Sequence, residues 1–107
     1  MIAEALFEQV KRKLNITWED DETTARVNDI MASAVPDLID KLGITDSEYD
    51  FSKAGTENTL FLAYCLYEWN HALNEFDENY ARLIAQVRAK YEVKQFTESE
   101  GAGSEQV

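Results

Sequence analysis

Apolar residues recur every three or four positions through most of this 107-residue chain, and this spacing restricts its fold more than any other feature. Such spacing lines up apolar side chains on one face of an α-helix. Four glycines and one proline argue against a many-stranded β-sandwich, because tight turns need those residues repeatedly. The sequence therefore predicts an all-α fold, a small bundle of about four helices with a disordered C-terminal tail.

Four helical segments are expected, the first ending near Asn15 and the second ending at Gly43. Their apolar stripes cover residues 2–14, 27–42, 60–69 and 76–91. The third segment is apolar on nearly every face and is expected in the middle of the bundle. The periodicity continues across Pro36, which predicts a bent helix and not a break. Residues 44–55 are expected to form the longest internal loop, and residues 73–77 a short turn.

The chain has room for one folded domain, because single cores usually occupy roughly 100 to 200 residues. We assign residues 1–96 to this helical domain. Residues 97–107 have almost nothing apolar to bury, and they are expected to form a flexible C-terminal tail.

The net charge of −11 narrows the possible partners. The excess negative charge is spread along the chain, because residues 1–54 have a net charge of −6 and residues 55–107 a net charge of −5. Such a surface repels nucleic acid and anionic membranes, which bind proteins through Lys and Arg. The longest apolar run, residues 60–67, is far shorter than the roughly 20 residues that a membrane helix needs. We expect no membrane partner and no specific binding of DNA.

The chemistry-bearing residues are few, which predicts a protein that is not an enzyme and needs no cofactor or metal. Cys65 is the only cysteine, and it lies among apolar residues that would bury it. His71 follows six residues later, which turns it roughly 240° away on a helix, so the two do not pair as nucleophile and base. The acidic run at residues 19–22 suits a helix N-terminus better than a metal site. One cysteine and an acid-interrupted N-terminus indicate a protein kept in a reducing cytoplasm.

Aromatic residues exceed what a small four-helix core comfortably encloses, so some are expected to be partly exposed. Four of them lie in predicted loops or in the tail and are candidates for a subunit interface. These candidate interface residues are Trp18, Tyr49, Phe51 and Phe96.

Several segments in order resemble the head-tail connector (adaptor) proteins of long-tailed bacteriophages. The first half of the resemblance is LFEQVKRKLNI at residues 6–16, followed by an acidic stretch and a long helix that ends in Leu42 and Gly43. The second half is Glu57 and Asn58 before an apolar helix, then YCLYEWN at 64–70, FDENY at 76–80 and RAKY at 88–91. The resemblance covers roughly residues 5 to 94.

This resemblance implies a helical subunit that assembles as a homo-oligomeric ring, typically a dodecamer, beneath the portal protein of the virion. Such a ring extends the DNA channel, keeps the packaged genome from leaking and docks the stopper or tail-completion protein. It would be made in the host bacterial cytoplasm and act at the head-tail junction. By position, residues 44–55 and 92–107 would contact neighbouring subunits or the portal, and no catalytic motif carries over. An acidic channel wall would let double-stranded DNA slide without specific binding.

An alternative from a different class is a small acidic inhibitor that mimics DNA and binds a basic DNA-processing protein. The twofold excess of acids over bases suits such a role. The spread of charge over both halves of the chain argues against it.

Overall fold

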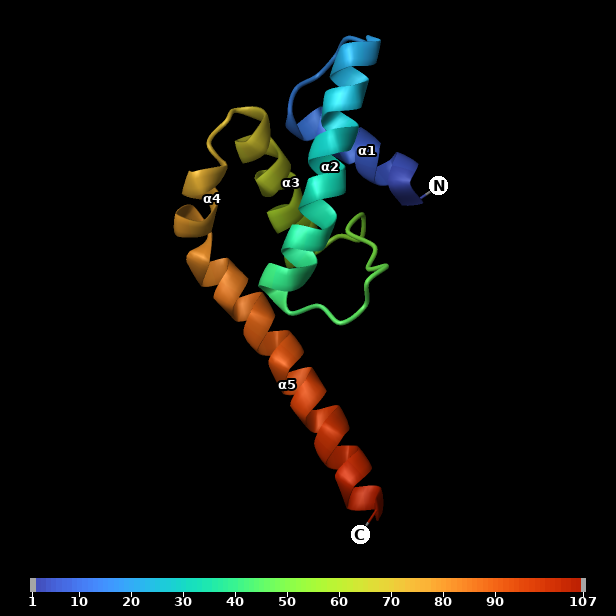
Figure 1. Ribbon diagram of the computed structural model, residues 1–107, viewed down its shortest axis with the longest axis vertical. Coiled ribbons are helices and arrows are strands. Elements are labelled where there is room, and N and C mark those ends of the chain that lie inside the picture. Colours follow the sequence, from blue (N-terminus) through green and yellow to red (C-terminus); the bar gives the residue numbers. More distant parts are fainter. Residues whose placement is uncertain (1, 107) are drawn as a thin grey trace.

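The computed structural model describes the backbone of residues 2–106 and the side chains of residues 4–94. Every regular element in this part of the chain is a helix, which confirms the all-α class (Figure 1). In chain order the helices are α1 (Ile2–Lys13), α2 (Asp21–Leu42), α3 (Thr56–Trp69), α4 (Leu73–Asn79) and α5 (Ala81–Gln106). The segment between α2 and α3 contains no helix, as predicted for residues 44–55.

Helices α2 and α3 form the centre of the molecule, and each packs against the other and against α1 and α5. The apolar run of α3 is buried against these neighbours, as its sequence predicts. Wholly buried side chains come from α1, α2, α3 and α4 and from the loop between α2 and α3, and they include Val10, Val27, Leu38, Leu42, Phe51, Leu60, Phe61, Cys65 and Phe76.

Helix α2 has well-defined ends. The Asp20 side chain accepts a hydrogen bond from the backbone N–H of Thr23 at 2.7 Å, which satisfies one of the unpaired amides of the first turn. Gly43 ends the helix with φ +69°, a left-handed conformation that glycine adopts without a steric penalty. Between these ends the helix continues through Pro36, so the prediction that proline does not stop it is confirmed.

The predicted fourth helix is two helices, and the turn predicted at residues 73–77 is wrong. These residues form α4, and Tyr80 separates it from α5. The reason is Phe76, which is 0% exposed and packs edge-on against the Tyr64 ring and the Tyr67 ring. This short helix carries the Phe76 ring into the core, and burial of that ring outweighs the turn preference of the polar residues beside it.

Helix α5 extends well beyond the packed body of the molecule (Figure 1). The principal extents of the chain are 60 × 32 × 19 Å. Its helical backbone continues to Gln106, and the flexibility expected of residues 97–107 stays a prediction. A helix anchored by packing gains one hydrogen bond for each further residue, so extension costs little once the helix has formed. The side chains of this segment lie outside the described residues.

Candidate functional site at the α2–α5 junction

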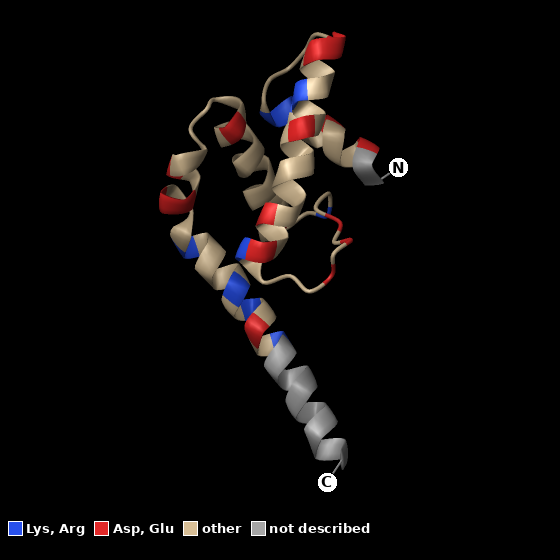
Figure 2. Cartoon of the chain, viewed as in Figure 1, with Lys and Arg blue, Asp and Glu red and all other residues tan. Residues whose placement is uncertain are grey.

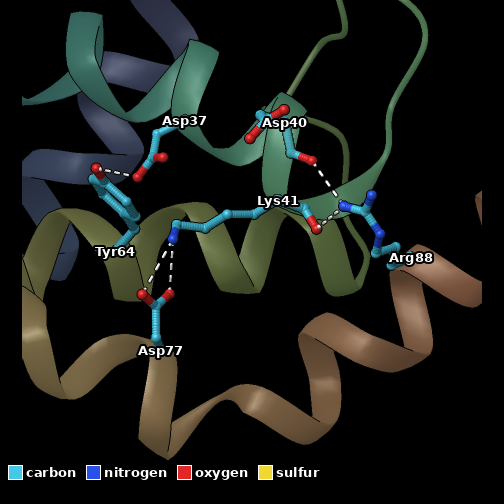
Figure 3. Close-up of polar contacts among 6 residues, drawn as sticks. All are labelled: Asp37, Asp40, Lys41, Tyr64, Asp77 and Arg88. Atoms are coloured by element: carbon cyan, nitrogen blue, oxygen red, sulfur yellow. Dashed lines mark hydrogen bonds and ion pairs between the residues drawn. The ribbon is translucent and has the colours of Figure 1, made fainter.

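The C-terminal end of α2 is the point where α3, α4 and α5 are joined to it by polar contacts (Figure 3). The last carbonyls of any helix have no partner within the helix. In this chain Arg88 of α5 donates from Nη1 to the carbonyl oxygens of Asp40 at 3.0 Å and Lys41 at 3.1 Å. A cation at this end of the helix is also favoured by the helix dipole. Arg88 therefore fixes α5 against the end of α2.

Two more contacts join the same part of α2 to its other neighbours (Figure 3). Lys41 pairs with Asp77 of α4 at 3.0 Å, and the hydrogen bond to Asp77 raises the pKa of Lys41. The Tyr64 hydroxyl of α3 donates to Asp37 at 2.7 Å. Burial, together with this carboxylate, raises the pKa of Tyr64, so the phenol stays protonated and keeps donating. The end of α2 is thus held on three sides.

Glu57 at the start of α3 anchors α5 at a second point. It is the one buried charged residue in the described part of the chain, at 7% exposure. Lys90 Nζ and the Tyr91 hydroxyl each donate to Glu57 Oε2 at 2.7 Å. Burial opposes ionisation of Glu57, but the hydrogen bonds from Lys90 and Tyr91 outweigh it and lower its pKa to about 2. The carboxylate is therefore ionised at neutral pH.

A groove of about 480 Å³ opens beside this junction. Arg88 forms one wall, and the remaining lining comes from α2 and the start of the following loop: Val35, Pro36, Ile39, Asp40, Gly43, Ile44, Thr45 and Ser47. Its exposed lining is more apolar than polar. A shallow groove of this kind, with an apolar floor and a charged rim, suits another protein surface better than a small polar substrate.

Two of the predicted interface aromatics keep exposed surface. Trp18 is 49% exposed, and its Nε1 donates to Thr23 Oγ1 at 3.0 Å, which fixes the indole beside the N-terminus of α2. Tyr49 is half-buried, with Lys53 Nζ 5.7 Å from the centre of its ring. Among the described residues, no contact joins Trp18 to Tyr49, so the two do not form one cluster.

The other two predicted interface aromatics, Phe51 and Phe96, show no exposed ring in the described residues. Phe51 is 1% exposed, so it belongs to the hydrophobic core and presents almost no surface in this structure. Its ring stacks on Phe61 of α3 with ring centres 4.9 Å apart, which explains why a loop residue is buried. The Phe96 side chain lies outside the described residues, so its role stays a prediction.

Cys65, His71 and the acidic run at residues 19–22 were the candidates for chemistry, and each has contacts that suit a structural role. Burial raises the pKa of Cys65 to about 12, so the thiol is protonated at neutral pH. His71 lies in the turn after α3 with φ +57°, and its Nε2 is 3.3 Å from Arg26 Nη2. Within residues 4–94 no three His, Cys, Asp or Glu side chains are placed to hold a metal ion. Asp20 in the acidic run has its pKa lowered by hydrogen bonds from Thr23, as a helix cap does.

Basic residues are concentrated in the described part of α5, although each half of the chain has a similar net charge (Figure 2). Residues 14–80 contain three basic and fifteen acidic side chains. Residues 81–94 on α5 contain four basic side chains and one acidic side chain. The molecule therefore has a basic segment, residues 81–94 of α5, beside an acidic body.

Sequence reasoning missed Glu57 and Arg88 as anchors of α5. Their partners lie 33 and 48 residues away, so no local pattern connects them. One signal was present, because Gly43 marks a helix end whose carbonyls need donors. It does not indicate which basic residue supplies them.

Comparisons with protein-family models, with curated proteins and with solved structures find no match to this chain. No helix in the described residues has the length and apolar character that crossing a membrane requires.

Proposed function

We propose that this protein is a head-tail connector (adaptor) subunit of a long-tailed bacteriophage, which assembles as a ring beneath the portal and docks the stopper or tail. The observation that carries the proposal is the division of the chain into a packed helical body and a helix that projects beyond it. A projecting helix gives a small subunit a surface that its own core does not use. The resemblance of residues 5 to 94 to this family supports the same role.

The contacts at the end of α2 give the projecting helix a fixed direction. Two hydrogen bonds anchor α5 to the body. Arg88 of α5 donates to the Asp40 carbonyl of α2 at 3.0 Å, and Lys90 of α5 donates to Glu57 of α3 at 2.7 Å. A ring needs each subunit to present its contact surfaces at a constant angle. Fixing α5 at two points satisfies this requirement.

The test is to disrupt the reading frame in the phage or prophage that carries it and to image the induced lysate by electron microscopy. We expect separate heads and tails, with heads that do not retain or transfer their DNA. Expression of the intact protein in trans is expected to restore joined particles. Normal joined particles without the protein would refute the connector role.

In that case the acidic inhibitor becomes the better hypothesis. The fifteen acidic side chains in residues 14–80 are the observation that favours it, because they concentrate negative charge on the folded body. Capture of a basic DNA-processing protein that duplex DNA displaces would support this second role.

Deleting residues 97–107 is expected to leave the fold intact and to weaken attachment to the portal. The body is closed by contacts that end at Tyr91 in the described residues, so the deletion removes no core side chain. Circular dichroism and urea unfolding measure the fold, and co-sedimentation with portal rings measures attachment. Unchanged attachment by the truncated protein would contradict this role for the tail.

A further inference from the structure

A small open cavity of about 220 Å³ lies between α2 and the end of α3, and it shares no lining residue with the groove at the α2–α5 junction. Its volume is below the roughly 300 to 1,000 Å³ of sites for drug-sized ligands, so it suits a molecule about as large as one amino acid. All but one of the lining residues are polar or charged, and the set is Arg26, Asp29, Ile30, Ser33, Glu68 and His71.

The positive charge of this cavity belongs to Arg26, which uncharged groups hold in place. The guanidinium carbon lies 4.1 Å from the centre of the Trp69 ring, and Nη2 donates to the Trp69 carbonyl oxygen at 2.7 Å. Nη2 is also 3.3 Å from His71 Nε2. A guanidinium only donates, so His71 Nε2 accepts and the ring proton is on Nδ1. Within residues 4–94, the Nε and Nη1 groups of Arg26 have no hydrogen-bond partner.

Two carboxylates, from Asp29 of α2 and Glu68 of α3, line the same cavity. Neither forms an ion pair with any residue that the structure describes, although Arg26 belongs to the same lining. The cavity therefore keeps its positive and negative groups apart. A ligand that carries both an anion and a cation would pair with both at once, through charge-assisted hydrogen bonds.

We propose that this cavity binds a free α-amino acid with a basic side chain, such as arginine. The α-carboxylate of the ligand accepts hydrogen bonds from Arg26 and from His71 Nδ1. The α-ammonium group and the basic side chain of the ligand donate to Asp29 and Glu68. The charges then balance, because two cations meet two carboxylates and one carboxylate meets one guanidinium. This inference goes beyond the connector role and does not rest on it.

The test is an NMR titration of the full, ¹⁵N-labelled chain with L-arginine hydrochloride, up to about 10 mM at constant ionic strength. The chain has two tryptophans, so it has two indole N–H signals. Trp69 reports on the cavity because Arg26 lies over its ring, and Trp18 serves as the reference for non-specific effects. We expect the Trp69 signal to shift and to saturate, with a Kd below about 1 mM.

Three ligand analogues separate the contributions of the ligand's groups. Agmatine lacks the carboxylate, Nα-acetyl-arginine lacks the α-ammonium group, and norleucine lacks the basic side chain. Each is expected to bind at least about tenfold more weakly than arginine, because each leaves a charged group of the cavity without its partner.

Variants of the chain test the two carboxylates. Asp29→Asn and Glu68→Gln are each expected to weaken arginine binding at least about tenfold. The matched control is Glu78→Gln on α4, which removes the same charge from an exposed residue outside the cavity and is expected to leave binding unchanged. Circular dichroism shows whether each variant is folded.

Three results would overturn the inference. They are a Trp69 signal that does not saturate with arginine, equal binding of agmatine and arginine, and equal weakening by Glu78→Gln and the two cavity variants. The last result would mean that the net charge of the chain, and not the cavity, governs binding. Because the titration uses the isolated chain, its failure would leave the connector role standing.

Discussion

Replacing Phe51 by alanine is expected to lower the free energy of unfolding by about 3 to 5 kcal/mol, the range for deleting a buried phenylalanine side chain. The ring is 1% exposed, stacks on Phe61 and receives the edge of Tyr49 at 5.0 Å between ring centres. Its removal leaves a cavity between the α2–α3 loop and α3. Urea unfolding followed by circular dichroism, with linear extrapolation to water, measures the change.

The matched control is Trp18→Ala, because both residues are aromatic and lie in connecting segments. Trp18 is 49% exposed, so its replacement is expected to cost about 1 kcal/mol or less, mostly from contacts beside the N-terminus of α2. Equal losses in the two variants would contradict the placement of Phe51 in the core.

Replacing Glu57 by glutamine is expected to lower the free energy of unfolding by about 2 to 3 kcal/mol at pH 7. The change keeps the side-chain volume but removes the charge that accepts from Lys90 and Tyr91. The Lys90 side chain is 57% exposed, so solvent screening keeps the loss below that of a fully buried pair. Urea unfolding of both proteins measures the difference.

The difference in free energy of unfolding between the unmodified chain and Glu57→Gln is expected to depend on pH. The pKa of Glu57 is about 2 in the folded chain and 4.5 as the ordinary value, so the unfolded chain binds the proton more tightly. The stabilising contribution is therefore complete above about pH 5 and is lost as the pH falls from about 4.5 to about 2. We expect the difference in free energy of unfolding between the two proteins to disappear as the pH falls over this interval.

An exposed pair on the same helix provides the control. Glu92 accepts from Arg88 at 3.2 Å, and its side chain is 65% exposed, so Glu92→Gln is expected to change stability by about 0.5 kcal/mol or less. If the Glu57→Gln gap stayed constant from pH 7 to pH 2, ionisation of Glu57 would not be what anchors α5.

The helices that repeat a regular apolar pattern could be predicted from the sequence. For α2, the spacing of apolar residues, the acidic first turn and Gly43 all indicate the same helix, and the structure confirms it. The burial of α3 follows equally from its apolar run. In these segments local preference and long-range packing favour the same structure.

The remaining features depend on contacts between segments that are distant in the sequence. Phe51 looks like an exposed loop residue until the loop folds back on Phe61, and α4 looks like a turn until Phe76 meets Tyr64. Trp18 lies outside the candidate site and keeps the exposure predicted for it, whereas the groove beside the α2–α5 junction exists only after folding. The net charge of each half does not show the basic segment at residues 81–94, which a finer count along the sequence would have found.

Helix α5 is fixed near Arg88 and Glu57, so a small rotation about these two contacts moves its far end by a larger distance. From Tyr91 to Gln106 the helix has fifteen residues of rise, or about 22 Å. A rotation of about 10° at these contacts would therefore sweep the far end through roughly 4 Å. A substitution at Glu57 can then change where the end of the chain points without touching it. The direction of the C-terminal half of α5 therefore depends on side chains at residues 57 and 88, far from the end of the chain.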